Sequence, residues 1–195
     1  MLPVANRNVF FVKEHVGFFK AASNYDILNE QGQPILLCRE ERLGFFTKML
    51  RFTDYKSMTP FEVIVRTPEG QPVLCVKRGW TFFRSKVDVL DENGQRVGGF
   101  LQKLFSIGGA FTVMGANDAP LCTLQGKWTS WEFSFKAENN ELARVTKKWA
   151  GLGKELFTSA DNYVLTIADH VPPNNPVRLL ILGAVLCIDK VLKEK

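Results

Sequence analysis

The sequence lacks the motifs that mark familiar enzymes. It contains no HExxH, GxSxG or P-loop motif, and no GxGxxG motif placed before a helix. Only two histidines, His15 and His170, occur in 195 residues. The glycine pairs at 98–99 and 108–109 stand in strand-like contexts, which favours bends over phosphate-binding loops. We therefore expect that the protein is not an enzyme; a catalytic site assembled from scattered residues is the less favoured alternative.

Cysteine is scarce, and long apolar runs are missing. No CxxC pair occurs, which argues against a zinc site or a disulfide framework and predicts buried, reduced thiols in a cytoplasmic protein. The strongest apolar run, 179–188, is half the roughly 20 residues that a bilayer crossing needs. Residues 1–7 lack the regions of a signal peptide. The four cysteines stand singly within apolar stretches, at Cys38, Cys75, Cys122 and Cys187.

The charge excess is modest. Lysine and arginine number 25 against 20 aspartates and glutamates, giving a net charge of +5. Such an excess suits an anionic membrane surface or a phosphorylated head group. No Lys/Arg run or nucleic-acid-binding motif appears, so we expect no nucleic-acid partner.

What the chain does contain is typical of a folded β protein. Its hydrophobic fraction of 46% and charged fraction of 23% are ordinary for globular domains. Sixteen phenylalanines are unusual, and aromatic side chains favour pleated sheets and bury much area each. The composition therefore predicts an all-β core, and the length suits one domain over residues 1–195.

One pattern recurs along the chain: a run alternating at period two, a turn with Gly, Asn or Asp, and a second run. Five such hairpins and the chain ends predict about twelve strands. A sheet that large closes into a barrel or splits into a sandwich, and irregular spacing disfavours a propeller. Residues 10–22 fit a first strand or a short helix. The hairpins begin at Tyr25, Phe61, Val87, Phe111 and Trp131.

The C-terminal segment predicts a buried helix. Pro172, Pro173 and Pro176 break the chain, and Pro176 stands where a helix begins well. Residues 177–192 are then apolar on nearly every side, which is typical of a helix buried on every face. The predicted fold is a closed antiparallel β-barrel of about 12 strands around a buried C-terminal α-helix.

Two segments carry a resemblance to a known family. Residues 148–152 (KWAGL) and 155–162 (ELFTSADN), followed by Tyr163, resemble the signature of the phospholipid scramblases, and 181–189 is similar to their terminal helix. The resemblance extends from about Phe10 over most of the chain. It implies the tubby-like barrel, shared with LURP-one-related proteins, and lipid scrambling as the family activity. Family analogy alone is a weak warrant for that activity.

Where scramblases carry an acylated cysteine cluster, this sequence has RGWTFFRSK at 78–86, without cysteine. The segment is a candidate membrane-binding group, in which aromatic rings would enter the interface and cations would meet head groups. The interpretation that we favour is that the rings fill the core, because this is the commoner fate of aromatic residues. The group consists of Lys77, Arg78, Trp80, Phe82, Phe83, Arg84 and Lys86.

A second basic group, Lys147 and Lys148 with Lys154, surrounds Trp149. By resemblance, tubby-like barrels bind phosphoinositide head groups with surface lysines and arginines, and a phosphate cluster needs several convergent cations. For either basic group alone, we favour the interpretation that it is part of an ordinary charged outer face.

The resemblance also implies a calcium segment. Here Ser159 replaces its first acid, Asp161 and Asp169 remain, and His170 stands at the last acidic position. Calcium takes six to eight oxygen ligands, often several carboxylates. Asp161 and Asp169 are therefore weak calcium candidates, and we expect no cofactor.

These observations predict a peripheral phospholipid- or phosphoinositide-binding protein on the cytoplasmic face of a membrane, with an anionic lipid surface as partner. Lipid transport is less supported, because no polar path through the hydrocarbon is evident. The alternative is a soluble adaptor that recognises a protein or small ligand at the barrel mouth. A carrier for a hydrophobic molecule is disfavoured, because the helix should fill the lumen.

Overall fold

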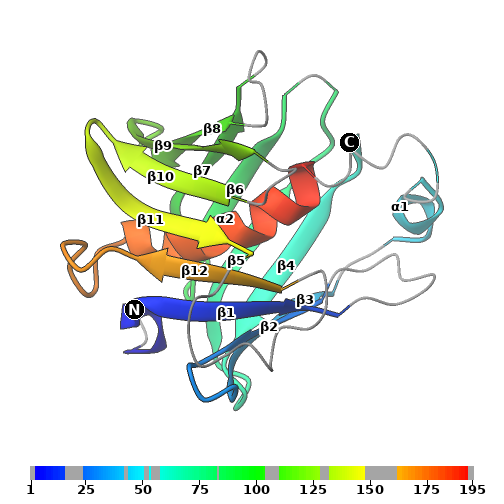
Figure 1. Ribbon diagram of the computed structural model, residues 1–195. Coiled ribbons are helices and arrows are strands. Elements are labelled where there is room, and N and C mark those ends of the chain that lie inside the picture. Colours follow the sequence, from blue (N-terminus) through cyan, green and yellow to red (C-terminus); the bar gives the residue numbers. More distant parts are fainter. Residues whose placement is uncertain are drawn as a thin grey trace.

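Twelve antiparallel strands form a closed ring in the computed structural model (Figure 1). The structure describes residues 3–15, 24–41, 44–50, 53, 58–82, 84–103, 110–127, 132–147 and 162–192. The strands are β1 (Val9–Glu14), β2 (Tyr25–Leu28), β3 (Pro34–Glu40), β4 (Phe61–Arg66), β5 (Pro72–Arg78), β6 (Lys86–Asp91), β7 (Arg96–Gln102), β8 (Ala110–Gly115), β9 (Pro120–Lys127), β10 (Glu132–Ala137), β11 (Asn140–Thr146) and β12 (Asn162–Ile167). A short helix α1 (Phe45–Leu50) and a 3-10 turn η1 (Pro3–Asn6) accompany them.

The ring closes between the first and last strands. β1 pairs with β12 in a register that runs from Val9 opposite Thr166 to Lys13 opposite Asn162. All five predicted hairpins are present, as β2–β3, β4–β5, β6–β7, β8–β9 and β10–β11. Closure removes the unpaired strand edges that would otherwise invite aggregation. Of the undecided segment 10–22, the part up to Glu14 is strand, and 16–22 lies outside the described residues.

The C-terminal helix α2 (Val177–Leu192) lies inside this ring, as the sequence predicted. It packs against β5, β6, β7 and β12 and against η1. Inward residues of the strands, such as Val87, Val89, Phe133 and Phe135, share one buried cluster with it. At Gly183 a Cβ atom would stand 3.2 Å from the Val76 side chain, so glycine lets the helix approach β5 closely. The predicted barrel with a buried helix is confirmed.

The barrel has two unlike ends. The five hairpin turns, η1 and the start of α2 gather at one end, which we call the turn end. The first residues of β2, β4, β6, β8, β10 and β12 and the C-terminal end of α2 lie at the other end, which we call the loop end. Figure 1 shows the N-terminus at the turn end and α1 at the loop end.

A buried arginine seals the turn end. Arg178, only 1% exposed, donates hydrogen bonds to the carbonyl oxygens of Ala5 (3.1 Å), Val171 (2.7 Å) and Arg7 (2.7 Å) and to Asn8 Oδ1 (2.7 Å). Burial lowers the pKa of its guanidinium, which nonetheless stays charged because arginine starts so high. One side chain thereby ties the N-terminal segment and the β12–α2 linker to the first turn of the helix.

The cysteines behave as isolated thiols. All four are free, with Cys38, Cys122 and Cys187 buried and Cys75 half-buried. Desolvation raises the pKa of Cys38 to about 12 and that of Cys122 to about 11, which suppresses the reactive thiolate. The prediction of buried thiols is confirmed for three of the four.

Candidate functional site: an exposed aromatic loop with flanking cations

The site is the connection between β5 and β6 at the loop end, residues 79–85. Its backbone is held from two sides. The amide of Thr81 donates to the carbonyl of Met58 (3.2 Å), and the Thr81 hydroxyl donates to the carbonyl of Arg84 (2.6 Å). On the other side, Arg84 Nε donates to the backbone carbonyl of Gln102 (3.1 Å). The backbone amide of Gln102 donates to the carbonyl of Ser85 (2.9 Å). Backbone hydrogen bonds therefore hold the loop at Thr81 and at Ser85.

Two large aromatic side chains of this loop face solvent. Trp80 is 55% exposed and Phe82 is 72% exposed. The interpretation that these rings fill the core is thus wrong for both. Phe83, the third predicted ring, lies outside the described residues. Exposed tryptophan and phenylalanine on one loop are unusual and indicate a contact surface.

Three of the predicted cations, on β5, on β6 and on the loop between them, are exposed. Lys77, Arg84 and Lys86 all reach solvent, and Arg84 stands on the loop itself. Lys77 faces Glu62 and Asp88 across the neighbouring strands, and Lys86 Nζ lies 3.7 Å from Asp118 Oδ1 with both groups well exposed. Exposed pairs of this kind are weak, so these lysines remain available to an anionic surface.

Arg78 corrects the sequence prediction. It is 4% exposed and packs beneath the loop, where it donates to the carbonyl of Thr59 (2.6 Å) and to the Ser85 hydroxyl (3.4 Å). Its guanidinium carbon lies 4.9 Å from the Phe61 ring centre, a cation–π distance. Because side chains alternate along a strand, Arg78 points inward where its neighbour Lys77 points outward. Arg78 supports the loop from inside and does not share the exposed cationic surface.

The second basic group is described only at Lys147. This side chain is exposed just after β11, and its Nζ lies 5.8 Å from the ring centre of the buried Tyr163. Lys148, Trp149 and Lys154 lie outside the described residues. A head-group role for Lys147 and Lys148 stays a prediction.

The structure uses the calcium candidate Asp169 in another way. Its Oδ1 accepts a hydrogen bond from Asn8 Nδ2 (2.7 Å), and Asn8 Oδ1 accepts from Arg178. Asp169 therefore extends the arginine clamp at the turn end. Asp161 lies outside the described residues. Among the residues that the structure describes, no group of three or more His, Cys, Asp or Glu side chains is placed to hold a metal ion.

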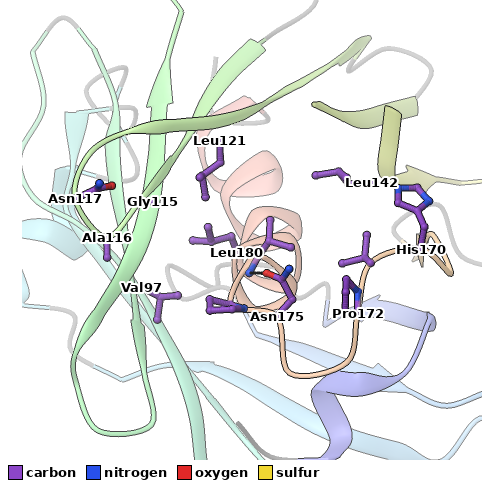
Figure 2. A pocket seen from close by; sticks show the side chains of 13 residues that line it. Val97, Gly115, Ala116, Asn117, Leu121, Leu142, His170, Pro172, Asn175 and Leu180 are labelled. Carbon is purple, nitrogen blue, oxygen red and sulfur yellow. Dashed lines mark hydrogen bonds between the residues drawn. The ribbon is translucent and has the colours of Figure 1, made fainter. Parts of the chain in front are cut away.

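A cavity of about 620 Å³ opens at the turn end, far from the aromatic loop (Figure 2). No single stretch of sequence pointed to it, because its lining comes from β7, β8, β9, β11, the β12–α2 linker and α2. The most telling sign is Leu121, which stands 47% exposed at its edge.

No helix in the described ranges joins the length and apolar character that a bilayer crossing requires. The fold and site together define a closed β-barrel that encloses its own helix and displays two aromatic side chains and an arginine on one loop. The family model named Scramblase matches residues 8–195, so the chain belongs to the scramblase family, as the sequence resemblance indicated.

Three curated relatives are similar to this chain. A phospholipid scramblase family protein of Schizosaccharomyces pombe is 24% identical over 190 residues, covering 90% of this chain and 50% of its own length. Human phospholipid scramblase family member 5 is 24% identical, covering 90% of this chain and 68% of its own. Altered inheritance rate of mitochondria protein 25 of Saccharomyces cerevisiae is also 24% identical, covering 83% and 57%. The chain thus spans about half the length of the fission-yeast relative.

A solved structure supports the architecture. A protein from Arabidopsis thaliana matches with a TM-score of 0.55 at 13% identity, covering 95% of this chain and 92% of the other. Identity this low concerns the fold alone, and the match shows that the two chains share a barrel fold.

Proposed function

We propose that the protein binds the surface of anionic phospholipid membranes peripherally, through the 79–86 segment at the loop end. The observation that carries the proposal is the exposure of Trp80 and Phe82 on a loop whose backbone is hydrogen-bonded in place. Burial of two rings at a lipid interface would remove this apolar area from water.

Electrostatics adds to this apolar contact. Arg84 stands between the exposed rings and Lys86, and each cation near an anionic surface contributes about 1 kcal/mol. The overall charge of +5 favours the same partner. A phosphoinositide, with more phosphate per head group, should bind more tightly than a lipid of single charge. The cytoplasmic face of a membrane, which carries the anionic lipids, is the surface that we propose.

Binding and lipid movement are separate proposals. Two relatives are named as phospholipid scramblase family proteins, whereas the exposed loop supports attachment. We propose attachment as the function of this surface, without a catalytic step.

Co-sedimentation with vesicles tests the proposal. Vesicles of phosphatidylcholine alone, with phosphatidylserine, and with a phosphoinositide should bind the protein in increasing order, with or without calcium. The double variant Trp80→Ser/Phe82→Ser should lose at least about tenfold in affinity, because two buried rings contribute well over 1.4 kcal/mol. Arg84→Gln should lose less and should weaken the salt dependence.

Leu121→Ser is the matched control, since it removes an exposed large apolar side chain at the opposite end. It should leave vesicle binding unchanged. Equal losses in the control and the double variant, or no binding by the wild-type chain to any vesicle, would refute the lipid surface and favour the adaptor alternative.

A further inference from the structure

The cavity at the turn end is built as a ligand site. Its volume of about 620 Å³ lies within the range of roughly 300–1,000 Å³ typical of small-molecule pockets. It reaches from the surface, where Leu121 is 47% exposed, to Leu180, which is fully buried inside the barrel. Helix α2 fills the lumen along most of its length, but its first turn leaves this space between the helix and the strands.

The walls of the cavity are aliphatic. Figure 2 shows Leu121, Leu142 and Leu180 pointing toward the same space from β9, β11 and α2. No phenylalanine, tyrosine, tryptophan or acidic side chain takes part among the lining residues. Such walls suit a flexible saturated chain, which fills an irregular apolar space and needs no ring stacking or hydrogen bonds along its length.

The polar groups at the cavity favour a hydrogen-bond acceptor. Asn175 Oδ1 accepts the amide of Val177 at 3.0 Å and so caps α2. Only an oxygen can accept from a backbone N–H, so the other end of this side chain is the NH₂ donor. Figure 2 shows that amide among the apolar side chains, with the His170 imidazole at the edge. A donor amide and an imidazole, with no carboxylate among the lining residues, match an anionic head.

We infer that this cavity binds a single-chain carboxylate amphiphile, of the fatty-acid class, with its chain against Leu121, Leu142 and Leu180 and its carboxylate toward Asn175 and His170. The inference goes beyond the proposed function, because it concerns another ligand at the opposite end of the barrel. A protein attached to a membrane by its loop end would hold this cavity toward water. The ligand would therefore enter from solution.

Equilibrium dialysis of the full chain with radiolabelled dodecanoate, kept below its micelle concentration, tests the inference. We expect saturable binding at one site. Dodecylamine, which is a cation, should bind at least about tenfold more weakly, because a donor amide repels an ammonium group.

Two variants locate the site. Asn175→Asp keeps an oxygen that caps Val177 but replaces the donor with a negative charge, so dodecanoate should bind at least about tenfold more weakly while the fold is preserved. Ala116→Trp, at an exposed lining position, should fill the space and weaken dodecanoate and dodecylamine alike. Met49→Asp, at an exposed apolar position outside the cavity, should change the binding of neither dodecanoate nor dodecylamine.

Saturable binding that Asn175→Asp and Ala116→Trp both reduce supports the site. Absence of saturable binding, equal affinity for the amine, or binding that both variants leave intact overturns it. Trp80→Ser/Phe82→Ser separates the two proposals, because it should weaken vesicle binding at least about tenfold and leave dodecanoate binding unchanged. The failure of one proposal would therefore leave the other standing.

Discussion

Each end of the barrel contains a buried arginine, and the two are used differently. Arg178 at the turn end is surrounded by oxygen acceptors of the N-terminal segment and the β12–α2 linker. Arg78 at the loop end donates to Thr59 and Ser85 and lies against the Phe61 ring. Arg178 closes the turn end by joining separate chain segments. Arg78 packs beneath the loop between β5 and β6 and supports it.

The apolar surfaces near these two arginines also differ in shape. At the turn end, where Arg178 lies, the accessible apolar surface lines a concave cavity. Above Arg78 the loop projects, and the apolar surface left over is convex, with Trp80 and Phe82 in solvent. Concave apolar surface suits a small ligand, and convex apolar surface beside cations suits an extended partner such as a membrane.

The largest effect expected is on stability at the turn end. Arg178→Met should lower the free energy of unfolding by about 3–5 kcal/mol, because several buried carbonyl oxygens lose their donor at once. Arg78→Met should cost about 1–3 kcal/mol, because the buried carbonyl of Thr59 loses the donor at 2.6 Å. Urea denaturation followed by tryptophan fluorescence measures both. Equal losses in the free energy of unfolding for Arg178→Met and Arg78→Met would contradict the contrast between the two ends. Arg144→Met, on the outer face of the barrel, is a near-neutral control.

The next effect concerns two glycines. A Cβ at Gly98 on β7 would lie 2.1 Å from the Met114 carbonyl oxygen and 3.1 Å from Leu180, and its φ is +156°. Gly98→Ala should therefore cost about 2–3 kcal/mol through overpacking and strain. A Cβ at Gly79 in the aromatic loop would meet nothing within 4 Å, so Gly79→Ala should be neutral or slightly stabilising. Thermal unfolding of both variants checks this; a tolerant Gly98 would contradict the tight approach of β7, β8 and α2.

A smaller effect is expected at the calcium candidate. Asp169→Asn weakens one hydrogen bond to Asn8 and should cost about 1 kcal/mol. Because we assign this carboxylate to the clamp, added calcium should leave the melting temperature of wild type and variant unchanged. A calcium-dependent rise in wild type that the variant lacks would return Asp169 to metal binding.

The smallest stability effect should come from the aromatic loop. Phe82→Ser changes an exposed side chain and should alter the free energy of unfolding by no more than about 0.5 kcal/mol. The same variant should still reduce vesicle binding. A large loss of stability would show that the ring serves the fold, and the case for an exposed contact surface would fail.

The sequence was sufficient for the elements and not for their long-range contacts. Period-two alternation and turn residues are local signals, so all five hairpins were predictable. The C-terminal helix is apolar on nearly every side, and this pattern predicted its position inside the barrel. The inward direction of Arg78 was also available, since it continues the buried phase of Leu74 and Val76 along β5.

Other features could not be predicted. The clamp of Arg178 joins residues more than 160 positions apart, and no periodic pattern encodes such a pairing. The cavity depends on where α2 begins relative to strands from the middle of the chain. The exposure of Trp80 and Phe82 depends on hydrogen bonds from their loop to Met58 and Gln102, which composition alone does not reveal.

The enclosure of α2 has a consequence for biosynthesis. The ribosome makes all twelve strands before it makes the helix that they surround, and the closing strand β12 comes only shortly earlier. Until residues 177–192 emerge, the nascent strands have no partner for their inward valines and phenylalanines. Such exposed apolar surface is what holding chaperones bind. Folding of this barrel should therefore be completed only after residues 177–192 have left the ribosome, with its rate-limiting step after that point.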